Sequence, residues 1–363
     1  MAERLKDRFF TDASVKAFAK VVKRHYPAFD DKKFVRDLTS DAFRGLELMQ
    51  MARRATESMA RLLPKSYKRA LRILLEVAPD AEGMETFCLP TFVELYGLDD
   101  WDTSLPAMAL ITKYASCEFA IRPFLLKDPD RAMAFLGELA EDEDPKVRRL
   151  ASEGCRPRLP WAVALPQFKK DPSPILPILE KLMDDDSESV RTSVANNLND
   201  ISKDHPKLVL DVCERWQGTS KDTDRIIKRA CRTMLKAGDT RALRLFGFGD
   251  PKSLDVKQLR LSKKTAAIGD SLRFSFVLMV AGRRASKVRL EYVVGYVKAT
   301  GKTSNKVFQI KEDTLAPGEH EVSRKLSFAD QSTRKHHPGK HRISIVVNGV
   351  VKAETEVALR ARA

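Results

Sequence analysis

Hydrophobic and polar positions follow two different periods along the chain. Up to about residue 245, apolar residues recur three or four positions apart, as in amphipathic helices. Beyond the segment 245–253, which is rich in glycine and proline, every second residue from Leu272 to Leu278 is apolar, as in a half-buried strand. The pattern therefore predicts a helical part followed by a part built of strands.

Three segments of the helical part repeat one arrangement. A capping residue stands three positions before an apolar-basic pair, as expected where a helix begins. The pairs Val147-Arg148, Val190-Arg191 and Ile227-Lys228 follow Asp144, Ser187 and Asp224 in this way. Because periods of about 40 residues are typical of stacked HEAT-type helix pairs, we predict an α-solenoid with a concave face. Further helices are expected at 35–63 and 66–78, and a weaker repeat lies in "LITKYASCEF".

The strand-rich part ends in the segment "ISIVVNGVVKAETEVAL", where Asn348-Gly349 is flanked by β-branched residues. This is a strong local signal for a β-hairpin. Short strands without helices favour an immunoglobulin-like sandwich. The predicted fold is thus an all-α HEAT-like α-solenoid followed by an all-β immunoglobulin-like sandwich, with domains at 1–250 and 256–363.

Positive charge is concentrated in the predicted sandwich. Residues 251–363 contain 23 Lys and Arg against 10 Asp and Glu, whereas the preceding residues contain 42 against 40. A basic module suggests a polyanion, most simply nucleic acid, because neutralised phosphates release counterions. Charge alone equally allows a basic domain that is merely soluble.

Several classes of protein are not expected from this sequence. The five cysteines are odd in number and form no C-x-x-C motif, so neither a disulfide framework nor a zinc site is predicted. The opening "MAERLKDRFF" lacks an apolar segment and no later apolar run is long enough to span a bilayer, so a cytoplasmic protein without a membrane is expected. The six histidines show no ligand spacing, and we predict no metal and no cofactor.

The candidate chemistry is a set of carboxylates among bases. Glu153 lies six residues after Val147, and Asp200 lies one helical turn beyond the matching position in the next repeat. Glu118 lies one place later in the weaker repeat, so all three should lie near one strip of the concave face. The surrounding bases are Lys146, Arg148, Arg149, Arg156, Arg158, Arg122, Lys203 and Arg191.

Such a groove attracts DNA, yet its carboxylates repel phosphates. The two features agree if the target is itself cationic, as an N-alkylated base is. Breaking its glycosidic bond also builds positive charge on the sugar, and a carboxylate about 4 Å away gains roughly 4 kcal/mol at an effective dielectric near 20. Realised only in the transition state, that gain corresponds to about three decades in rate.

Ordinary structural roles remain open for the same residues. Glu153 could pair with Arg149 one turn earlier. Asp200 could bond the loop 202–206. Trp161 could pack in the core, with stacking against DNA as the alternative.

At these residues the sequence resembles the AlkC/AlkD superfamily of HEAT-like-repeat DNA glycosylases, and AlkC most closely. The stretches that carry the resemblance are "SCEFAIRPFL", "DPKVRRLASEGCRPRLPW" and "SVRTSVANNLNDISKDHP". The C-terminal part resembles the immunoglobulin-like domain of one AlkC branch.

The resemblance implies a monofunctional DNA glycosylase that hydrolyses the N-glycosidic bond of cationic alkylated bases, 3-methyladenine and 3-methylcytosine, in bent double-stranded DNA. It implies that Glu118, Glu153 and Asp200 are the catalytic carboxylates. The residues expected to bind DNA are Arg122, Arg148, Arg149, Arg156, Arg158, Trp161, Arg191, Asn197 and Lys203. We expect a monomer in the cytoplasm, associated with the nucleoid when it acts on DNA, and no obligate protein partner. A non-catalytic HEAT-repeat module that binds DNA or serves as a protein scaffold is the alternative.

Overall fold

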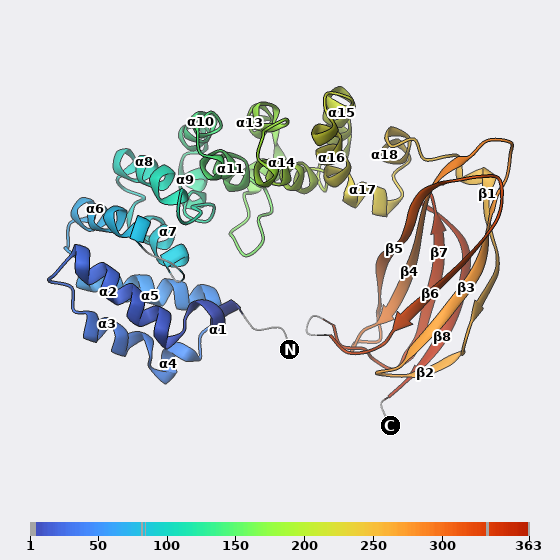
Figure 1. The fold of residues 1–363 in the computed structure, drawn as a ribbon, viewed down its shortest axis with the longest axis horizontal. Helices are drawn as coiled ribbons and strands as arrows, with labels where there is room; N and C mark the ends of the chain where they lie inside the picture. The colour runs from blue at the N-terminus through green and yellow to red at the C-terminus, as the bar shows by residue number, and fades with distance from the viewer. Residues whose placement is uncertain (1–4, 81–82, 84, 332–333, 362–363) are drawn as a thin grey trace. The chain divides into compact units, whose positions relative to one another are not determined.

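The computed structural model describes residues 5–80, 83, 85–331 and 334–361. Residues 1–4, the first part of the opening segment "MAERLKDRFF", lie outside the described residues. Along the described part of the chain, eighteen α-helices precede eight β-strands (Figure 1). This order confirms the predicted fold class.

The first ten helices lie between residues 5 and 139. They are α1 (Leu5–Phe9), α2 (Asp12–His25), α3 (Asp31–Leu38), α4 (Asp41–Arg44), α5 (Leu48–Leu62), α6 (Tyr67–Val77), α7 (Glu85–Tyr96), α8 (Trp101–Thr112), α9 (Arg122–Lys127) and α10 (Pro129–Leu139). The other helices are α11 (Pro145–Gly154), α12 (Pro166–Lys170), α13 (Leu176–Leu182), α14 (Glu188–Ile201), α15 (Pro206–Trp216), α16 (Lys221–Ala230), α17 (Arg232–Ala237) and α18 (Thr240–Leu245).

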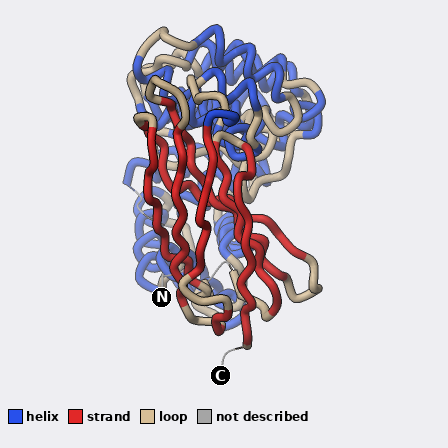
Figure 2. The backbone as a smooth tube through the Cα atoms, turned by 90° about the vertical axis from the view of Figure 1, so that its right-hand side faces the viewer, coloured by secondary structure: helices blue, strands red, loops and turns tan. Residues whose placement is uncertain are grey.

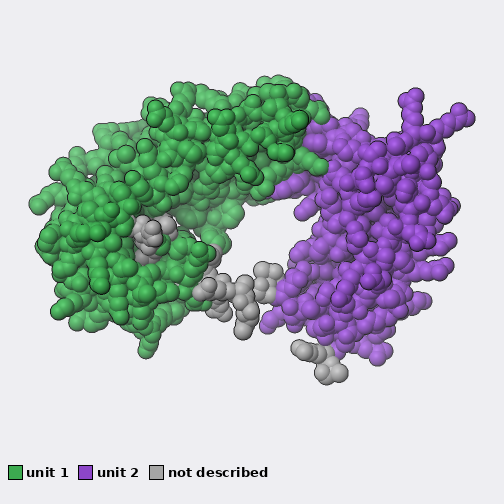
Figure 3. All heavy atoms as spheres, in the orientation of Figure 1, with its two compact units in different colours: residues 1–209, 215–230 green, residues 210–214, 231–363 purple. Residues whose placement is uncertain are grey.

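The chain divides into two compact units, residues 1–209 with 215–230 and residues 210–214 with 231–363 (Figure 3). The second unit therefore contains α17 and α18 as well as the sandwich. None of the helices described is both long enough and apolar enough to cross a membrane.

The predicted repeats form α11, α14 and α16, which pack against one another in sequence order. Within the first unit these helices line the inner side, and α10 and α13 lie on the outer side (Figure 1). Val147, Val190 and Ile227, the residues that define the period, are all buried. Val194, Leu198 and Ile201, which follow Val190 at helical spacing in α14, are buried as well, which confirms the repeat.

Two helix boundaries differ from the prediction because other caps compete. The third repeat begins at Lys221 rather than after Asp224, since Ser220 Oγ accepts the Thr223 amide at 3.0 Å. The predicted helix over 35–63 is three helices. Ser40 caps α4, and Glu47 forms a capping box with Gln50 that starts α5.

The strands form two sheets that pack as a sandwich (Figure 2). They are β1 (Leu254–Leu261), β2 (Thr265–Ala267), β3 (Ser271–Val280), β4 (Ser286–Val297), β5 (Thr303–Leu315), β6 (Gly318–Ser327), β7 (Gly339–Val347) and β8 (Val350–Arg360). One sheet has the order β1-β3-β6 and the other β2-β8-β7-β4-β5. Leu272, Phe274, Phe276 and Leu278 of β3 all point into the core.

The predicted hairpin joins β7 to β8. Asn348 and Gly349 both have positive φ, 45° and 80°, as a type I′ turn requires. This turn also contacts the helices of its own unit. Asn348 Nδ2 donates to the Gly249 carbonyl at 2.8 Å, and a side chain on Gly349 would lie 2.7 Å from Gly238 Cα. This turn, together with Lys287 of β4, whose Nζ donates to the Phe246 carbonyl at 2.9 Å, holds the sandwich to the end of the last two helices.

Candidate functional site

The three predicted carboxylates are joined by basic side chains into one series, which we call the charge chain. It runs from the turn before α9 to the residues just after α14. Its members, in spatial order, are Glu118, Arg149, Glu153, Arg156, Asp200 and Lys203. With three carboxylates and three bases, these six side chains together have no net charge.

The first half of the charge chain is centred on Arg149. Its Nη1 donates to Glu118 Oε2 at 2.7 Å, and its Nη2 lies 3.6 Å from Glu153 Oε1. Ser116 Oγ donates to the same Glu118 oxygen at 2.8 Å. The ordinary pairing of Glu153 with Arg149 thus exists, but it is the longer of the two ion pairs that Arg149 makes. Glu118 itself lies in a turn between α8 and α9, not on a repeated helix.

The second half is centred on Arg156, whose guanidinium bridges two repeats. Its Nη1 donates to Glu153 Oε1 at 2.6 Å, and its Nε donates to Asp200 Oδ2 at 2.9 Å. Ser193 Oγ donates to Glu153 Oε2 at 2.6 Å, and Lys203 Nζ donates to Asp200 Oδ1 at 3.0 Å. Asp200 therefore does bond the loop after its helix. Each of the four carboxylate oxygens has a donor. Asp200 Oδ2 also lies 2.8 Å from Arg156 Nη2, whereas Glu153 Oε2 and Asp200 Oδ1 each keep acceptor capacity for another donor.

The charge chain is buried in its middle and open at its ends. Exposed side-chain fractions are 7% for Glu153 and 3% for Asp200, against 29% for Arg149 and 40% for Lys203. Burial opposes the charge of Arg156, but Glu153 and Asp200 outweigh it and raise the pKa of the guanidinium. Arg156 is therefore a permanent cation between the two carboxylates.

A loop of residues 155–165 connects α11 to α12 beside this site and projects on the inner side of the unit (Figure 1). Trp161 is 69% exposed and has a positive φ of 67°, so the ordinary role considered for it, packing in the core, is wrong. Arg158 donates to both oxygens of Asp204, at 2.7 and 2.9 Å. The loop thus presents an aromatic ring and a partly exposed base to solvent.

Three residues that were expected to contact DNA are buried instead: Arg156, which lies between the two carboxylates, and Arg122 and Asn197. Arg122 has no exposed surface, and its guanidinium donates to the backbone carbonyls of Gly154, Arg156 and Val163. Asn197 is likewise fully buried, with Nδ2 donating to the Ser152 carbonyl at 2.8 Å. Neither side chain is placed to reach a phosphate, because both lie within the packed layer between repeats.

Arg148 and Arg191 brace neighbouring repeats. Arg148 donates to both oxygens of Asp185, at 2.6 and 3.0 Å, and also to carbonyls of its own turn. Arg191 donates to the Asp185 and Asp186 carbonyls and pairs with Asp222 at 3.2 Å. The acidic runs "EDED" and "DDD" just before these arginines are the signal that could have predicted this role. Their guanidinium donors are engaged within the protein rather than directed at a phosphate.

Sequence reasoning missed the hydroxyl groups of the site. Ser193 Oγ donates its proton to Glu153 Oε2 and lies 3.0 Å from the hydroxyl oxygen of Ser152. Ser152 and Ser193 are 41 residues apart, close to the repeat period, and this spacing could have drawn attention to the pair. Cys117 and Cys155 lie beside the carboxylates in sequence, but burial raises the pKa of each thiol to about 12. Both thiols are therefore protonated at neutral pH and are poor nucleophiles.

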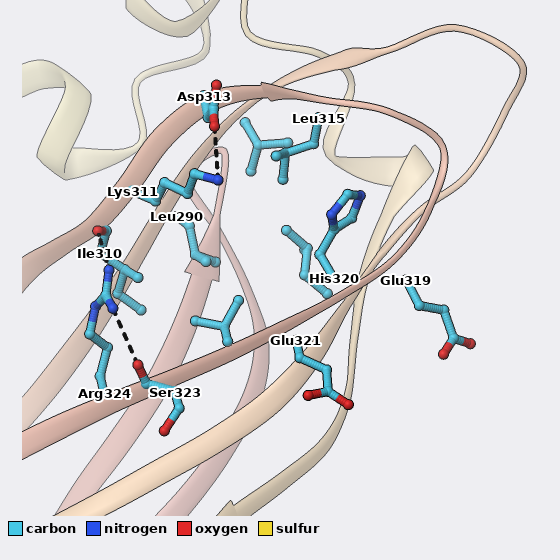
Figure 4. Close-up of a pocket in the computed structure, with 13 residues that line it drawn as sticks. Leu290, Ile310, Lys311, Asp313, Leu315, Glu319, His320, Glu321, Ser323 and Arg324 are labelled. Atoms are coloured by element: carbon cyan, nitrogen blue, oxygen red, sulfur yellow. Dashed lines mark hydrogen bonds and ion pairs between the residues drawn. The ribbon is translucent and has the colours of Figure 1, made fainter.

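The sandwich contains a separate cavity of about 410 Å³ between the edge strands β5 and β6 (Figure 4). Its floor is apolar, and three of the polar side chains drawn at its mouth have partners. Lys311 binds Asp313 at 2.8 Å, Arg324 donates to the Ile310 carbonyl at 3.0 Å, and His320 bonds the Ala316 carbonyl at 2.8 Å. The cavity offers no group comparable to the charge chain. Across the described ranges, no three His, Cys, Asp or Glu side chains are grouped as metal ligands.

Comparison with known families matches both parts of the chain. Residues 255–361 match the family "Uncharacterised protein YhaZ, C-terminal Ig-like domain", and residues 175–205 match the HEAT repeat. The chain is 46% identical over 332 residues to the uncharacterized protein YhaZ of Bacillus subtilis (strain 168), covering 91% of this chain and 92% of that protein.

Comparison with solved structures matches the whole chain. The alkylpurine DNA glycosylase AlkC of Pseudomonas fluorescens, bound to DNA containing an abasic site analog, is 36% identical, with a TM-score of 0.94. The match covers 99% of this chain and 100% of that chain. The resemblance predicted from the central stretches is thereby confirmed. The chain belongs to the AlkC family of the AlkC/AlkD superfamily of HEAT-like-repeat DNA glycosylases, in the branch with a C-terminal immunoglobulin-like domain.

Proposed function

We propose that this chain is a monofunctional DNA glycosylase that hydrolyses the N-glycosidic bond of cationic alkylated bases, 3-methyladenine and 3-methylcytosine, in bent double-stranded DNA. The observation that carries the proposal is the charge chain, in which two buried carboxylates from successive repeats are held by one arginine and remain able to accept further hydrogen bonds. Family membership supports the same activity.

The electrostatics of the charge chain favour a cationic target. Arg156 and its neighbours neutralise the carboxylates in the free protein, so the resting site does not repel DNA strongly. Where a cationic base and a sugar that is becoming cationic approach, fixed carboxylate oxygens stabilise the developing charge without reorganising. A neutral base offers no such gain in the ground state.

Asp200 and Glu153 are proposed to share the chemical step. One orients the attacking water and both stabilise the positive charge on the sugar. Their rigid bonds to Arg156, Ser193 and Lys203 hold the acceptor oxygens in place. Glu118, at the more exposed end, is proposed to contact the cationic base.

The DNA contacts are proposed for the open ends of the charge chain and for the loop beside it. Arg149, Arg158 and Lys203 would hold phosphates, and Trp161 would stack or wedge against the duplex. Residues 1–250 would form the glycosylase domain, and the basic sandwich 256–363 an accessory DNA-binding domain. The protein would act as a cytoplasmic monomer in base excision repair.

Base release tests the activity directly. Purified protein is incubated in EDTA with methylated DNA and, separately, with DNA that contains hypoxanthine, and free bases are measured by chromatography. The expected result is metal-independent release of 3-methyladenine and no release of the neutral base. If folded protein binds the methylated DNA and releases no base, a non-catalytic DNA-binding module or scaffold is the correct reading.

A further inference from the structure

Arg122, the first residue of α9, is an unusually placed charge. Its guanidinium has no exposed surface, and none of its hydrogen bonds goes to a carboxylate. Burial lowers the pKa of Arg122, but only to about 10, so the group is still a cation at neutral pH. A buried cation is costly unless it binds acceptors, and Nη2 of Arg122 has none, so the three carbonyls that Nε and Nη1 bind indicate what the residue does.

The three acceptors of Arg122 belong to the two ends of the loop 155–165. Nη1 donates to the carbonyls of Gly154 and Arg156 at 3.1 and 3.0 Å, where the loop begins. Nε donates to the Val163 carbonyl at 2.5 Å, where it ends. One planar guanidinium therefore spans the base of the loop, which a single point charge could not do.

The start of the loop is shaped to admit this guanidinium. Gly154 is the last residue of α11, where carbonyls lack helical partners and a cation is favoured. A side chain on Gly154 would lie 2.9 Å from Ile121 Cγ2, the residue before Arg122. The absence of a side chain at Gly154 lets the start of α9 approach the end of α11.

The loop carries two groups that the proposed reaction needs in fixed positions. Arg156 is held at its carbonyl by Arg122 while its own guanidinium bridges Glu153 and Asp200. Trp161, at the tip, has a φ of 67°, a conformation that a tryptophan keeps only when the surrounding chain imposes it.

We propose that Arg122 is a positioning residue: by tying the two ends of the loop 155–165, it sets Arg156 between the two carboxylates and Trp161 at the surface for the reaction proposed above. Its role in catalysis rests on the proposed function, whereas its effect on the loop does not. It touches neither DNA nor the reacting atoms.

The first test is amide hydrogen exchange in full-length Arg122→Lys. This variant keeps the positive charge but loses the planar guanidinium that binds both ends of the loop. Backbone amides that are hydrogen-bonded within the loop, such as those of Ala162 and Leu165, should therefore exchange about tenfold faster or more. Arg148→Lys is the matched control. It removes the guanidinium of another arginine that joins two repeats, and Arg148 does not contact the loop. Its loop should exchange as in the unchanged protein. Equal loop exchange in Arg122→Lys and the unchanged protein would overturn the proposal.

The second readout separates positioning from stability. At saturating protein, Arg122→Lys should release 3-methyladenine about 10- to 100-fold more slowly, while its Kd for DNA stays within about threefold. A faster-exchanging loop with an unchanged release rate would contradict the catalytic part. If the unchanged protein releases no base, the proposed function fails and the exchange experiment still decides the role of Arg122 in the loop. If Arg122→Lys does not fold, Gly154→Ala takes its place with the same expected exchange, and unchanged loop exchange there would overturn the proposal.

Discussion

Two buried arginines of this protein each lie between two carboxylates, one in each unit. In the solenoid, Arg156 binds Glu153 at 2.6 Å and Asp200 at 2.8 Å. In the sandwich, Arg289 binds Glu291 at 2.6 Å and lies 3.4 Å from Glu312. By composition and burial the two clusters are nearly the same.

Their surroundings differ. Glu291 is on the same strand as Arg289, and Glu312 is the register partner of Arg289 on β5. The backbone amide of Arg289 donates to Asn348 Oδ1. That cluster completes a sheet. The Arg156 cluster instead joins residues 44 positions apart in sequence and continues through Arg149 and Lys203 to the surface. Two buried carboxylates around an arginine are therefore not in themselves a sign of chemistry, and the connection of the Arg156 cluster to the surface is the difference on which the proposed function rests.

Replacing each central arginine should have the largest effect. Arg156→Met and Arg289→Met each leave buried carboxylates without their cation, so the free energy of unfolding should fall by about 3–5 kcal/mol in both. Denaturant unfolding measures this. Only Arg156→Met should also slow base release per folded molecule, and an equal loss in folded Arg289→Met would break the comparison.

A change at the exposed edge of the solenoid site, at Trp161, should lower DNA affinity without lowering the stability of the fold. Trp161→Ala should weaken binding to alkylated DNA by about 1–3 kcal/mol, because stacking is lost. The unfolding free energy should change by less than about 0.5 kcal/mol, because the side chain is largely exposed. Val163→Ala, in the same loop and also exposed, is the control and should leave binding unchanged. A loss of stability in Trp161→Ala as large as its loss of affinity would contradict this assignment.

The outer face of the three-stranded sheet should contribute to DNA affinity through its positive charge alone. Arg273 and Lys325 are register partners on β3 and β6, and Arg260 pairs with Ser275 beside them. Changing all three to Gln should reduce the slope of log K against log salt by up to about 3, with the unfolding midpoint unchanged. An unchanged slope would remove this face from the DNA interface.

A smaller effect should be a dependence of stability on pH in the unit that contains the sandwich. Burial lowers the pKa of His336 and of His341 in the sandwich, where Arg334, Asp330 and His337 are the neighbouring titratable or charged groups. The unfolded chain then binds protons below about pH 6.5 that the folded sandwich does not, so stability is full above that pH and falls as the pH drops. Melting of the sandwich near pH 7.5 and pH 5.5 measures this, and a His341→Gln variant should show the smaller difference. Equal pH dependence in the variant would contradict it.

The sequence predicted the two-part fold and the proximity of the carboxylates, whereas their catalytic role stays a prediction. The change of period, the three repeats and the Asn348-Gly349 turn all appear where local pattern and tertiary packing agree. Glu153 and Asp200 lie in the charge chain as their repeat positions predicted, whereas Glu118 joins it from a turn before α9 rather than from a repeated helix.

The roles of the arginines could not be predicted in the same way. Arg122, Arg148 and Arg191 occupy positions next to the apolar stripe, and spacing does not tell whether such a side chain turns to solvent or to the next repeat. That choice depends on acceptors that are distant in sequence, such as the Val163 carbonyl for Arg122 and the Asp185 carboxylate for Arg148.

The central claim is that the carboxylates held by Arg156 perform chemistry and those held by Arg289 do not. The most direct measurement is single-turnover release of 3-methyladenine by Glu153→Gln, Asp200→Asn and Glu291→Gln, with equal folded fractions and saturating protein. The account predicts that Asp200→Asn or Glu153→Gln loses about three decades in rate while still binding DNA, and that Glu291→Gln stays within about twofold. Rates that are the same in all three variants would contradict it.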